Sequence, residues 1–115
     1  MGEVKYHSFN EFWSFYLGEH QHPLNRRLHV VGTGLLLVVA LMVVVSEAYS
    51  YFALLPFIGY GFAWVGHFFV EKNRPATFTY PLWSLVADFK MFLFAVTGRL
   101  GDELKRCGVV PKEPN

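Results

Sequence analysis

Three apolar stretches dominate the hydrophobic pattern of this sequence. The first two, over residues 28–45 and 50–70, are long enough to cross the hydrocarbon core of a bilayer as helices. The third, over residues 81–97, contains Asp88 and Lys90 near its middle, and placing both charges in lipid would be costly. We therefore predict an antiparallel transmembrane hairpin, followed by a third helix that is re-entrant or lies in the membrane interface.

A shorter amphipathic pattern precedes the hairpin. Ser8 and Glu11 have the spacing of a capping box, and apolar residues follow at helical intervals over residues 9–17. Residues 99–115 are charged and contain proline, which predicts a short surface helix and a polar tail. The whole pattern predicts an all-α fold in which residues 1–115 form a single membrane-embedded domain.

Composition agrees with a membrane location. Of 115 residues, 53% are apolar and 18% aromatic, which is more than a soluble domain of this size can bury. The formal net charge is +1 and the ten Lys and Arg residues are scattered, so we expect no nucleic-acid partner. Because Cys107 is the single cysteine, an internal disulfide framework and a cysteine-based zinc site are excluded.

The basic residues predict the orientation of the hairpin. Arg26 and Arg27 precede the first span, Lys72 and Arg74 follow the second, and the loop between the spans has no Lys or Arg. The positive-inside rule then places both basic ends in the cytoplasm. We expect an integral membrane protein of a bacterial inner membrane or of the endoplasmic reticulum, with its site on the cytoplasmic side.

The predicted hairpin brings several histidines to the same depth. His29 lies at the start of the first span, His67 lies near the end of the second, and Glu71 follows His67 by one helical turn. His20 and His22 lie just before the first span, although His22 also fits an ordinary interfacial residue. Histidine and carboxylate are ligands of iron, manganese and zinc. The pattern therefore predicts a metal site at the basic end of the hairpin.

The surroundings of this predicted site favour an anionic lipid. Arg26 and Arg74 lie close to it in the sequence pattern, and a guanidinium group can hold a carboxylate through two parallel hydrogen bonds. An alkyl chain could run into the bilayer beside the spans, so a fatty acid fits both features. The residues expected to support the metal ligands are Asn25, Asp88 and Tyr80.

Two other functions are open on this pattern. Two histidines at equal depth on neighbouring spans could bind a haem from its two faces. Alternatively, the histidines and charges could only fix the helices in a non-catalytic, lipid-interacting membrane protein. A haem absorption band would indicate the first function, and the absence of stoichiometric metal would indicate the second.

Two blocks of the sequence resemble the signature of a known family, the yeast-type 2-hydroxy fatty acid dioxygenases, which were formerly a membrane family of unknown function. The similarity runs from about Phe9 to Met91. The first block contains Phe15-Tyr16, His20, Pro23, Asn25 and His29, and the second contains Gly66, His67, Glu71, Lys72, Arg74 and Pro75-Ala76.

The resemblance implies an iron(II)-dependent enzyme that uses molecular oxygen, without 2-oxoglutarate, to shorten a 2-hydroxy fatty acid by one carbon. This reaction is a form of α-oxidation. Carried over by motif position, His20, His29 and His67 match the family's histidines, and Glu71, Asn25 and Arg74 match its other polar positions. Together with the pattern above, we predict catalytic and metal-binding His20, His29, His67 and Glu71, substrate-binding Asn25, Arg26 and Arg74, and supporting Asp88, Tyr80 and His22.

The sequence departs from the family pattern in two places. The yeast-type chain has a second histidine directly after the position of His20, where this chain has Gln21. If that histidine is a ligand in the family, Glu71, His22 or water must take its place here. The two blocks are also joined by one short hairpin, without the additional spanning sequence of the longer members. A second copy of the chain could then complete the substrate groove, which would make the protein a homodimer.

Overall fold

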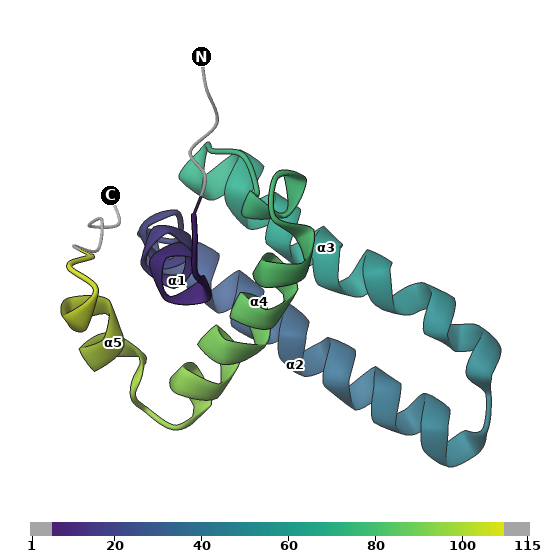
Figure 1. The fold of residues 1–115 in the computed structure, drawn as a ribbon. Coiled ribbons are helices and arrows are strands. Elements are labelled where there is room, and N and C mark those ends of the chain that lie inside the picture. Colours follow the sequence, from purple (N-terminus) through teal and green to yellow (C-terminus); the bar gives the residue numbers. More distant parts are fainter. Residues whose placement is uncertain (1–5, 110–115) are drawn as a thin grey trace.

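The computed structural model describes residues 6–109 and is helical, with no strand in that range (Figure 1). This confirms the predicted all-α fold. The elements in chain order are α1 (Phe9–Gly18), α2 (Pro23–Ser46), η1 (Tyr49–Leu54), α3 (Leu55–Val65), η2 (Gly66–Glu71), η3 (Ala76–Phe78), α4 (Pro81–Val96) and α5 (Leu100–Arg106).

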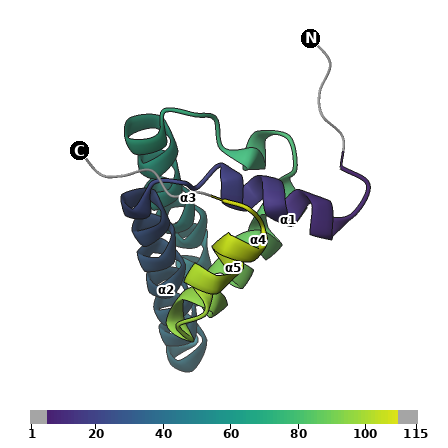
Figure 2. The same ribbon diagram turned by 90° about the vertical axis from the view of Figure 1, so that its left-hand side faces the viewer.

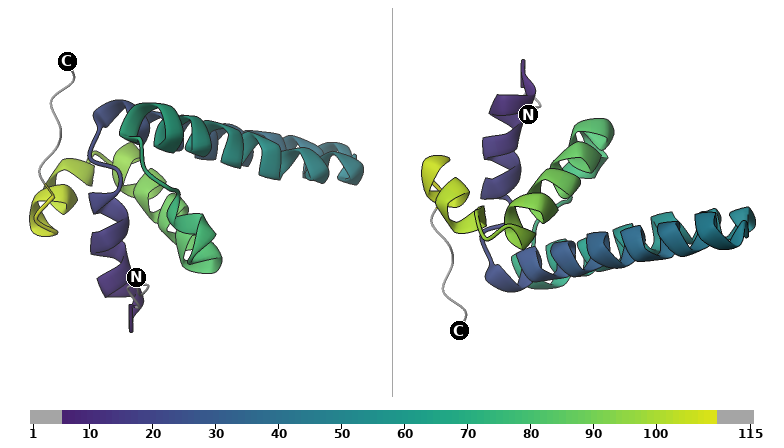
Figure 3. Two further views of the ribbon diagram at one scale, coloured as in Figure 1. Left: turned by 90° about the horizontal axis from the view of Figure 1, so that it is seen from above. Right: turned by 90° about the horizontal axis from the view of Figure 1, so that it is seen from below.

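The longest helices form an antiparallel hairpin. One arm is α2, and the other is the helical run from η1 through η2 (Figures 1 and 3). Both arms are long and apolar enough to cross a membrane: an 18-residue window has a mean hydropathy of 2.6 within Pro23–Ser46 and of 1.5 within Tyr49–Glu71. Only 17% of each apolar window is buried, whereas the core helix of a soluble protein would be mostly buried. The two helices therefore suggest that the protein is associated with a membrane.

The first arm begins earlier than residue 28, where the apolar pattern starts. Pro23 occupies the first turn of α2, where its missing N–H is not needed and its fixed φ suits the helix. The side chain of His22 caps the same end, because its Nδ1 accepts a hydrogen bond from the N–H of Leu24 at 3.2 Å. Hence α2 carries one polar turn, with Asn25 and Arg26, below its apolar run.

Figure 2 shows α1, α4 and α5 beside the hairpin, and the cluster of buried apolar side chains lies among these three helices. Ser8 caps α1 by accepting a hydrogen bond from the N–H of Glu11, as the sequence predicts. One face of α1 then packs on α4 and α5. The buried side chains at this junction are Phe12, Trp13, Tyr16 and Leu17 of α1, Ala87 and Met91 of α4, and Leu104 of α5.

The two charges of the third apolar stretch both face α1. Asp88 accepts a hydrogen bond from the hydroxyl of Tyr16, and the Lys90 ammonium lies 4.5 Å from the ring centroid of Trp13. With 16 residues, α4 is about 24 Å long, which is too short to cross a hydrocarbon core of about 30 Å without help. Its re-entrant or interfacial placement stays a prediction. Residues 110–115 of the predicted polar tail lie outside the described residues.

A buried carboxylate joins α5 to α1. Oε2 of Glu103 accepts a hydrogen bond from Trp13 Nε1 at 2.6 Å, and both of its oxygens accept hydrogen bonds from the Arg106 guanidinium. The hydrogen bonds from Arg106, helped by the one from Trp13, lower the pKa of Glu103 to about 2, although burial opposes this change.

We predict that Glu103 makes the unfolding free energy depend on pH in the acid range. Because its folded-state pKa lies below the ordinary glutamate value of about 4.3, its contribution is complete above that pH and is lost as the pH falls towards 2. Glu103→Gln should cost about 1 kcal/mol at pH 6 and should lose less stability than the wild type between pH 5 and pH 3. Thermal unfolding in detergent measures this, with the exposed neighbour Asp102→Asn as the control. Parallel pH profiles for the wild type and Glu103→Gln would contradict the prediction.

Candidate metal centre

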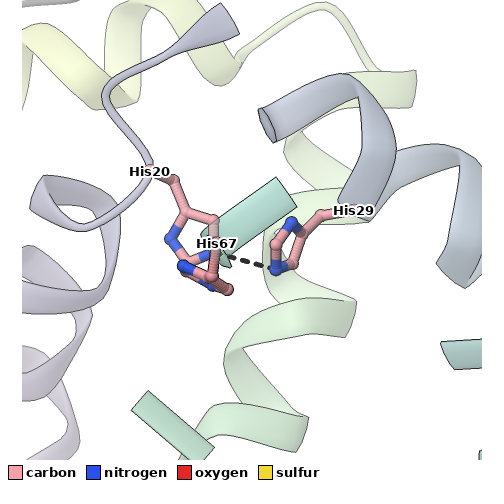
Figure 4. Close-up of side chains that lie close together, drawn as sticks. All are labelled: His20, His29 and His67. Atoms are coloured by element: carbon pink, nitrogen blue, oxygen red, sulfur yellow. Dashed lines mark hydrogen bonds between the residues drawn. The ribbon is translucent and has the colours of Figure 1, made fainter. Parts of the chain in front are cut away.

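Three buried histidines from three different segments meet at the basic end of the hairpin (Figure 4). His20 comes from the connection between α1 and α2, His29 from the second turn of α2, and His67 from η2. Their ligand nitrogens all lie within 4.8 Å of one another. Nε2 of His20 lies 3.0 Å from Nε2 of His29.

Backbone carbonyl groups fix the tautomers of two of these rings. Nδ1 of His20 lies 2.6 Å from the carbonyl oxygen of Tyr16, and Nδ1 of His29 lies 3.0 Å from that of Asn25. A carbonyl oxygen can only accept, so each Nδ1 must carry the proton and donate it. In the neutral rings, both Nε2 atoms are therefore unprotonated and point at each other.

A side-chain amide fixes the third ring in the same way. Nδ1 of His67 lies 2.7 Å from Oδ1 of Asn73. The orientation of that amide follows from its other end, because Nδ2 of Asn73 donates to the backbone carbonyl of Glu19 at 3.0 Å. His67 thus donates from Nδ1 and presents the lone pair of Nε2 to the other two histidines.

The three converging lone pairs fit a metal ion. Two unprotonated nitrogens 3.0 Å apart repel each other unless a cation lies between them. Nitrogens bound at about 2.1 Å to adjacent, right-angled positions of one ion would be about 3.0 Å apart. Each ring also donates its other N–H to an oxygen, as metal-bound histidines usually do. The three histidines, with these supporting hydrogen bonds, could therefore bind a metal ion.

The environment of His20 keeps the ring neutral. Burial lowers the pKa of His20 well below the usual histidine value, and the neighbouring His29 and His67 lower it further. A neutral imidazole is the form that coordinates a metal, so this environment favours ligation over protonation.

The local fold around His67 is not the α-helix that the sequence predicts. His67 lies in a π-helix, Gly66–Glu71, a form that is rare and often found at functional sites. Lys72 then takes a left-handed conformation, with φ of 62°, and reverses the chain. As a result the N–H of Asn73 donates to the carbonyl of His67 at 2.9 Å, and the Asn73 side chain reaches the His67 ring.

Glu71 is buried but does not join the cluster of three histidines. Its carboxylate instead accepts hydrogen bonds from the backbone N–H of His22 and, at 3.4 Å, from Nδ2 of Asn25. A carboxylate at this place satisfies free N–H groups at the start of α2 and stabilises the positive end of the helix dipole. The structure thus gives Glu71 a role in holding α2, and its role as a metal ligand stays a prediction.

Asn25 of α2 is fully buried and lies against Gly66 of the second arm. A Cβ atom at Gly66 would lie 1.8 Å from Oδ1 of Asn25, so only glycine fits there. Its side chain is held between the arms, and its backbone carbonyl supports His29. Substrate binding by Asn25 stays a prediction.

The two arginines predicted to bind substrate lie in different environments. Nη1 of Arg26 donates to the carbonyl oxygens of His20 and Gln21, at 2.8 and 2.9 Å, and so fixes the loop that carries the first histidine. Arg74 is exposed, and its guanidinium lies over the ring of Phe78.

Of the other predicted supporting residues, Asp88 shares a cavity lining with one of the three histidines. It is bonded to the hydroxyl of Tyr16, and with His29 it lines a cavity between the helices. Tyr80 lies in the core beside α1, where its hydroxyl accepts a hydrogen bond from the N–H of Tyr6.

Sequence reasoning missed Asn73 and the two supporting carbonyl groups. Asn73 lies inside the second signature block, between two basic residues, and nothing in its surroundings marks it as a partner of His67. The two carbonyl groups could have been found from the sequence. In both cases the carbonyl belongs to the residue four positions before the histidine: Tyr16 before His20, and Asn25 before His29.

The comparisons with known proteins bear on this cluster. A family model described as 2-hydroxy-palmitic acid dioxygenase Mpo1-like matches residues 6–100, which is nearly all of the described chain and includes all three histidines. No curated protein and no solved structure gave a significant match.

We predict that Asn73→Ala weakens metal binding by about 10-fold to 100-fold, because the His67 ring loses the acceptor that orients it. Titration of the metal-free protein with Zn²⁺ or, without oxygen, with Fe²⁺ measures the affinity. Asn10→Ala, at an exposed position of α1, is the matched control and should bind as the wild type does. Equal affinities for both variants would mean that Asn73 does not support the site.

Proposed function

The chain belongs to the 2-hydroxy-palmitic acid dioxygenase Mpo1-like family, and we propose from this membership that it is an iron(II)-dependent dioxygenase acting on 2-hydroxy fatty acids. The reaction shortens the acid by one carbon. It balances when one molecule of oxygen is consumed, the bond between the first and second carbons breaks, the first carbon leaves as carbon dioxide, the second becomes the new carboxyl group, and one water forms.

The observation that carries the proposal is the convergence of buried His20, His29 and His67, whose ligand nitrogens lie within 4.8 Å of one another. Three nitrogen ligands from one side leave open positions on an ion, as oxygen-using non-haem sites require. When bound there, iron(II) would supply Lewis acidity, orientation of the substrate and the redox capacity of the reaction.

The residues around the cluster fix and desolvate the site. The carbonyl groups of Tyr16 and Asn25 and the amide of Asn73 keep the ring protons on Nδ1. We propose that Arg26, half-buried beside the His20 loop, attracts the substrate carboxylate to this end of the hairpin. We further propose that Arg74, Glu71 and Asn25 line the approach to the metal or support its ligands.

In this proposal the fatty acid substrate reaches the site from the membrane, and the site lies near the membrane surface. The two ends of the hairpin that carry Lys and Arg residues are the ends that carry the histidines. By the positive-inside rule, we propose that the site faces the cytoplasm. A 2-hydroxy fatty acid can then keep its carboxylate near the arginines while its alkyl chain stays in lipid, and oxygen reaches the site freely.

The geometry favours a single ion over a haem. Haem ligated by two histidines needs the imidazoles on opposite faces of the macrocycle. Here the ring centroids of His20 and His29 are 4.3 Å apart, and those of His29 and His67 are 4.8 Å apart, with the rings edge to face. These contacts leave no room for a porphyrin between any two of the rings.

We predict that the purified protein retains about one iron per chain and that His67→Ala retains almost none, because one of the converging nitrogens is removed. Elemental analysis of protein purified without oxygen measures this. The matched control is His7→Ala, at an exposed histidine outside the cluster, which should retain the wild-type amount. Unchanged metal content in His67→Ala, or no metal in the wild type after iron loading, would overturn the assignment.

We further predict that the iron-loaded protein converts 2-hydroxypalmitic acid to the acid one carbon shorter, and leaves palmitic acid unchanged. The 2-hydroxyl group is the second donor that allows the substrate to chelate an ion together with its carboxylate. Mass spectrometry of the lipid products, with and without oxygen, measures the reaction. An iron-loaded protein that yields no shortened acid in the presence of oxygen would contradict the proposed function.

A further inference from the structure

A cavity of about 290 Å³ lies among α2, α3 and α4, directly beside the histidine cluster. His29 lines it at one end, together with Thr33 and Asp88. Towards the other end the lining is apolar, with Leu36 of α2 and Leu55 of α3. The cavity therefore has one polar end, at a proposed metal ligand, and an apolar remainder.

The lining residues follow one face of each arm of the hairpin. His29, Thr33 and Leu36 are spaced by four and three residues along α2. On α3, Gly59 and Ala63 are spaced by four, and His67 follows Ala63 by four more. Both faces thus lead from the histidines towards the middle of the hairpin. The distance from His29 to Leu36 along the helix axis is about 10 Å.

The chemistry of this cavity suits an alkyl chain. Water needs two or more polar partners to be stable in a cavity, and beyond His29, Thr33 and Asp88 the lining side chains are apolar except for Tyr60. Pro56, Tyr60 and Leu85 line the cavity and are exposed on the apolar surface of the molecule, so the cavity is reached from the side of the hairpin that faces lipid.

Gly59 keeps this space open. A Cβ atom built on Gly59 would lie 3.1 Å from Cδ1 of Leu36, which also lines the cavity. Gly61, two residues further on, faces the other way: it is exposed and no atom lies within 4 Å of its Cβ position. The two glycines of α3 therefore differ in what a larger side chain would fill.

We propose that this cavity binds the part of the substrate's alkyl chain next to its 2-hydroxy acid head, and that Gly59 is a specificity-determining residue because it leaves room for that chain. The inference rests on the proposed function, since it assigns the chain of the same substrate. The carboxylate and 2-hydroxyl lie at the histidines, and the following methylene groups run between α2 and α3 past Gly59.

Photolabelling tests this inference in a way that does not depend on turnover. The probe is 2-hydroxypalmitic acid with a diazirine near the middle of its chain and an alkyne at its end, added to the protein in phosphatidylcholine nanodiscs. We expect labels on α2 and α3 peptides that contain cavity residues, and competition by unlabelled 2-hydroxypalmitic acid. In Gly59→Leu the competed labelling should fall about tenfold or more, because leucine fills the cavity. In Gly61→Leu it should equal that of the wild type.

The thermal unfolding midpoint of each variant, measured in detergent, shows whether it is folded. Should Gly59→Leu fail to fold, Ala63→Leu fills the same cavity one turn nearer to His67 and should give the same loss. Wild-type labelling of a folded Gly59→Leu or Ala63→Leu variant would overturn the inference, as would competed labels confined to the exposed residues of α2 such as Val31 and Leu35.

Failure of this inference can be told apart from failure of the proposed function. Iron retention and oxygen-dependent shortening in the wild type, together with unaltered labelling of the filled variants, would reject the cavity alone. Competed cavity labelling in a protein that binds no iron and shortens no acid would support the cavity as a lipid site and reject the dioxygenase.

Discussion

Three buried imidazole rings whose free nitrogens face one another place the strongest demand on this structure. Such an arrangement is electrostatically unfavourable for the protein alone, because each Nε2 has lost its hydration and meets another lone pair. It persists because oxygen acceptors on the far side of each ring hold the proton on Nδ1. Those acceptors come from the last turn of α1, the first turn of α2 and the turn after η2, so the position of each of these elements matters to the site.

The fold divides the work between two regions. The hairpin exposes most of its apolar side chains and contributes two histidines at its basic end. The packed core of α1, α4 and α5 lies beside the hairpin. It fixes His20 through Tyr16, because the ring centroids of these two residues are 4.2 Å apart. Tyr16 also bonds to Asp88 of α4. One residue therefore links the histidine cluster, the core and the wall of the cavity.

Hydrophobic periodicity and the placement of basic residues were enough to predict the helical fold, the hairpin and the meeting of His29 with His67. Equal depth on two antiparallel helices follows from the lengths of the apolar runs alone. The π-helix could not be predicted, because residues 66–71 have the same apolar pattern whether five or four residues separate donor and acceptor. For the same reason the sequence places Glu71 beside His67, whereas its carboxylate reaches the start of α2. The part played by Asn73 depends on a left-handed residue, Lys72, that no propensity favours.

Because apolar surface surrounds the cavity between α2, α3 and α4, the lipid concentration that would determine its occupancy is the one within the membrane. A lipid that enters from the side of the hairpin is never sampled from water, so its relevant concentration is its mole fraction among the other lipids of the leaflet. Adding inert phospholipid would dilute such a substrate at constant total amount, and occupancy of the cavity would fall accordingly. For a cavity that binds such a lipid, the composition of the host membrane would regulate occupancy as directly as the supply of the lipid itself.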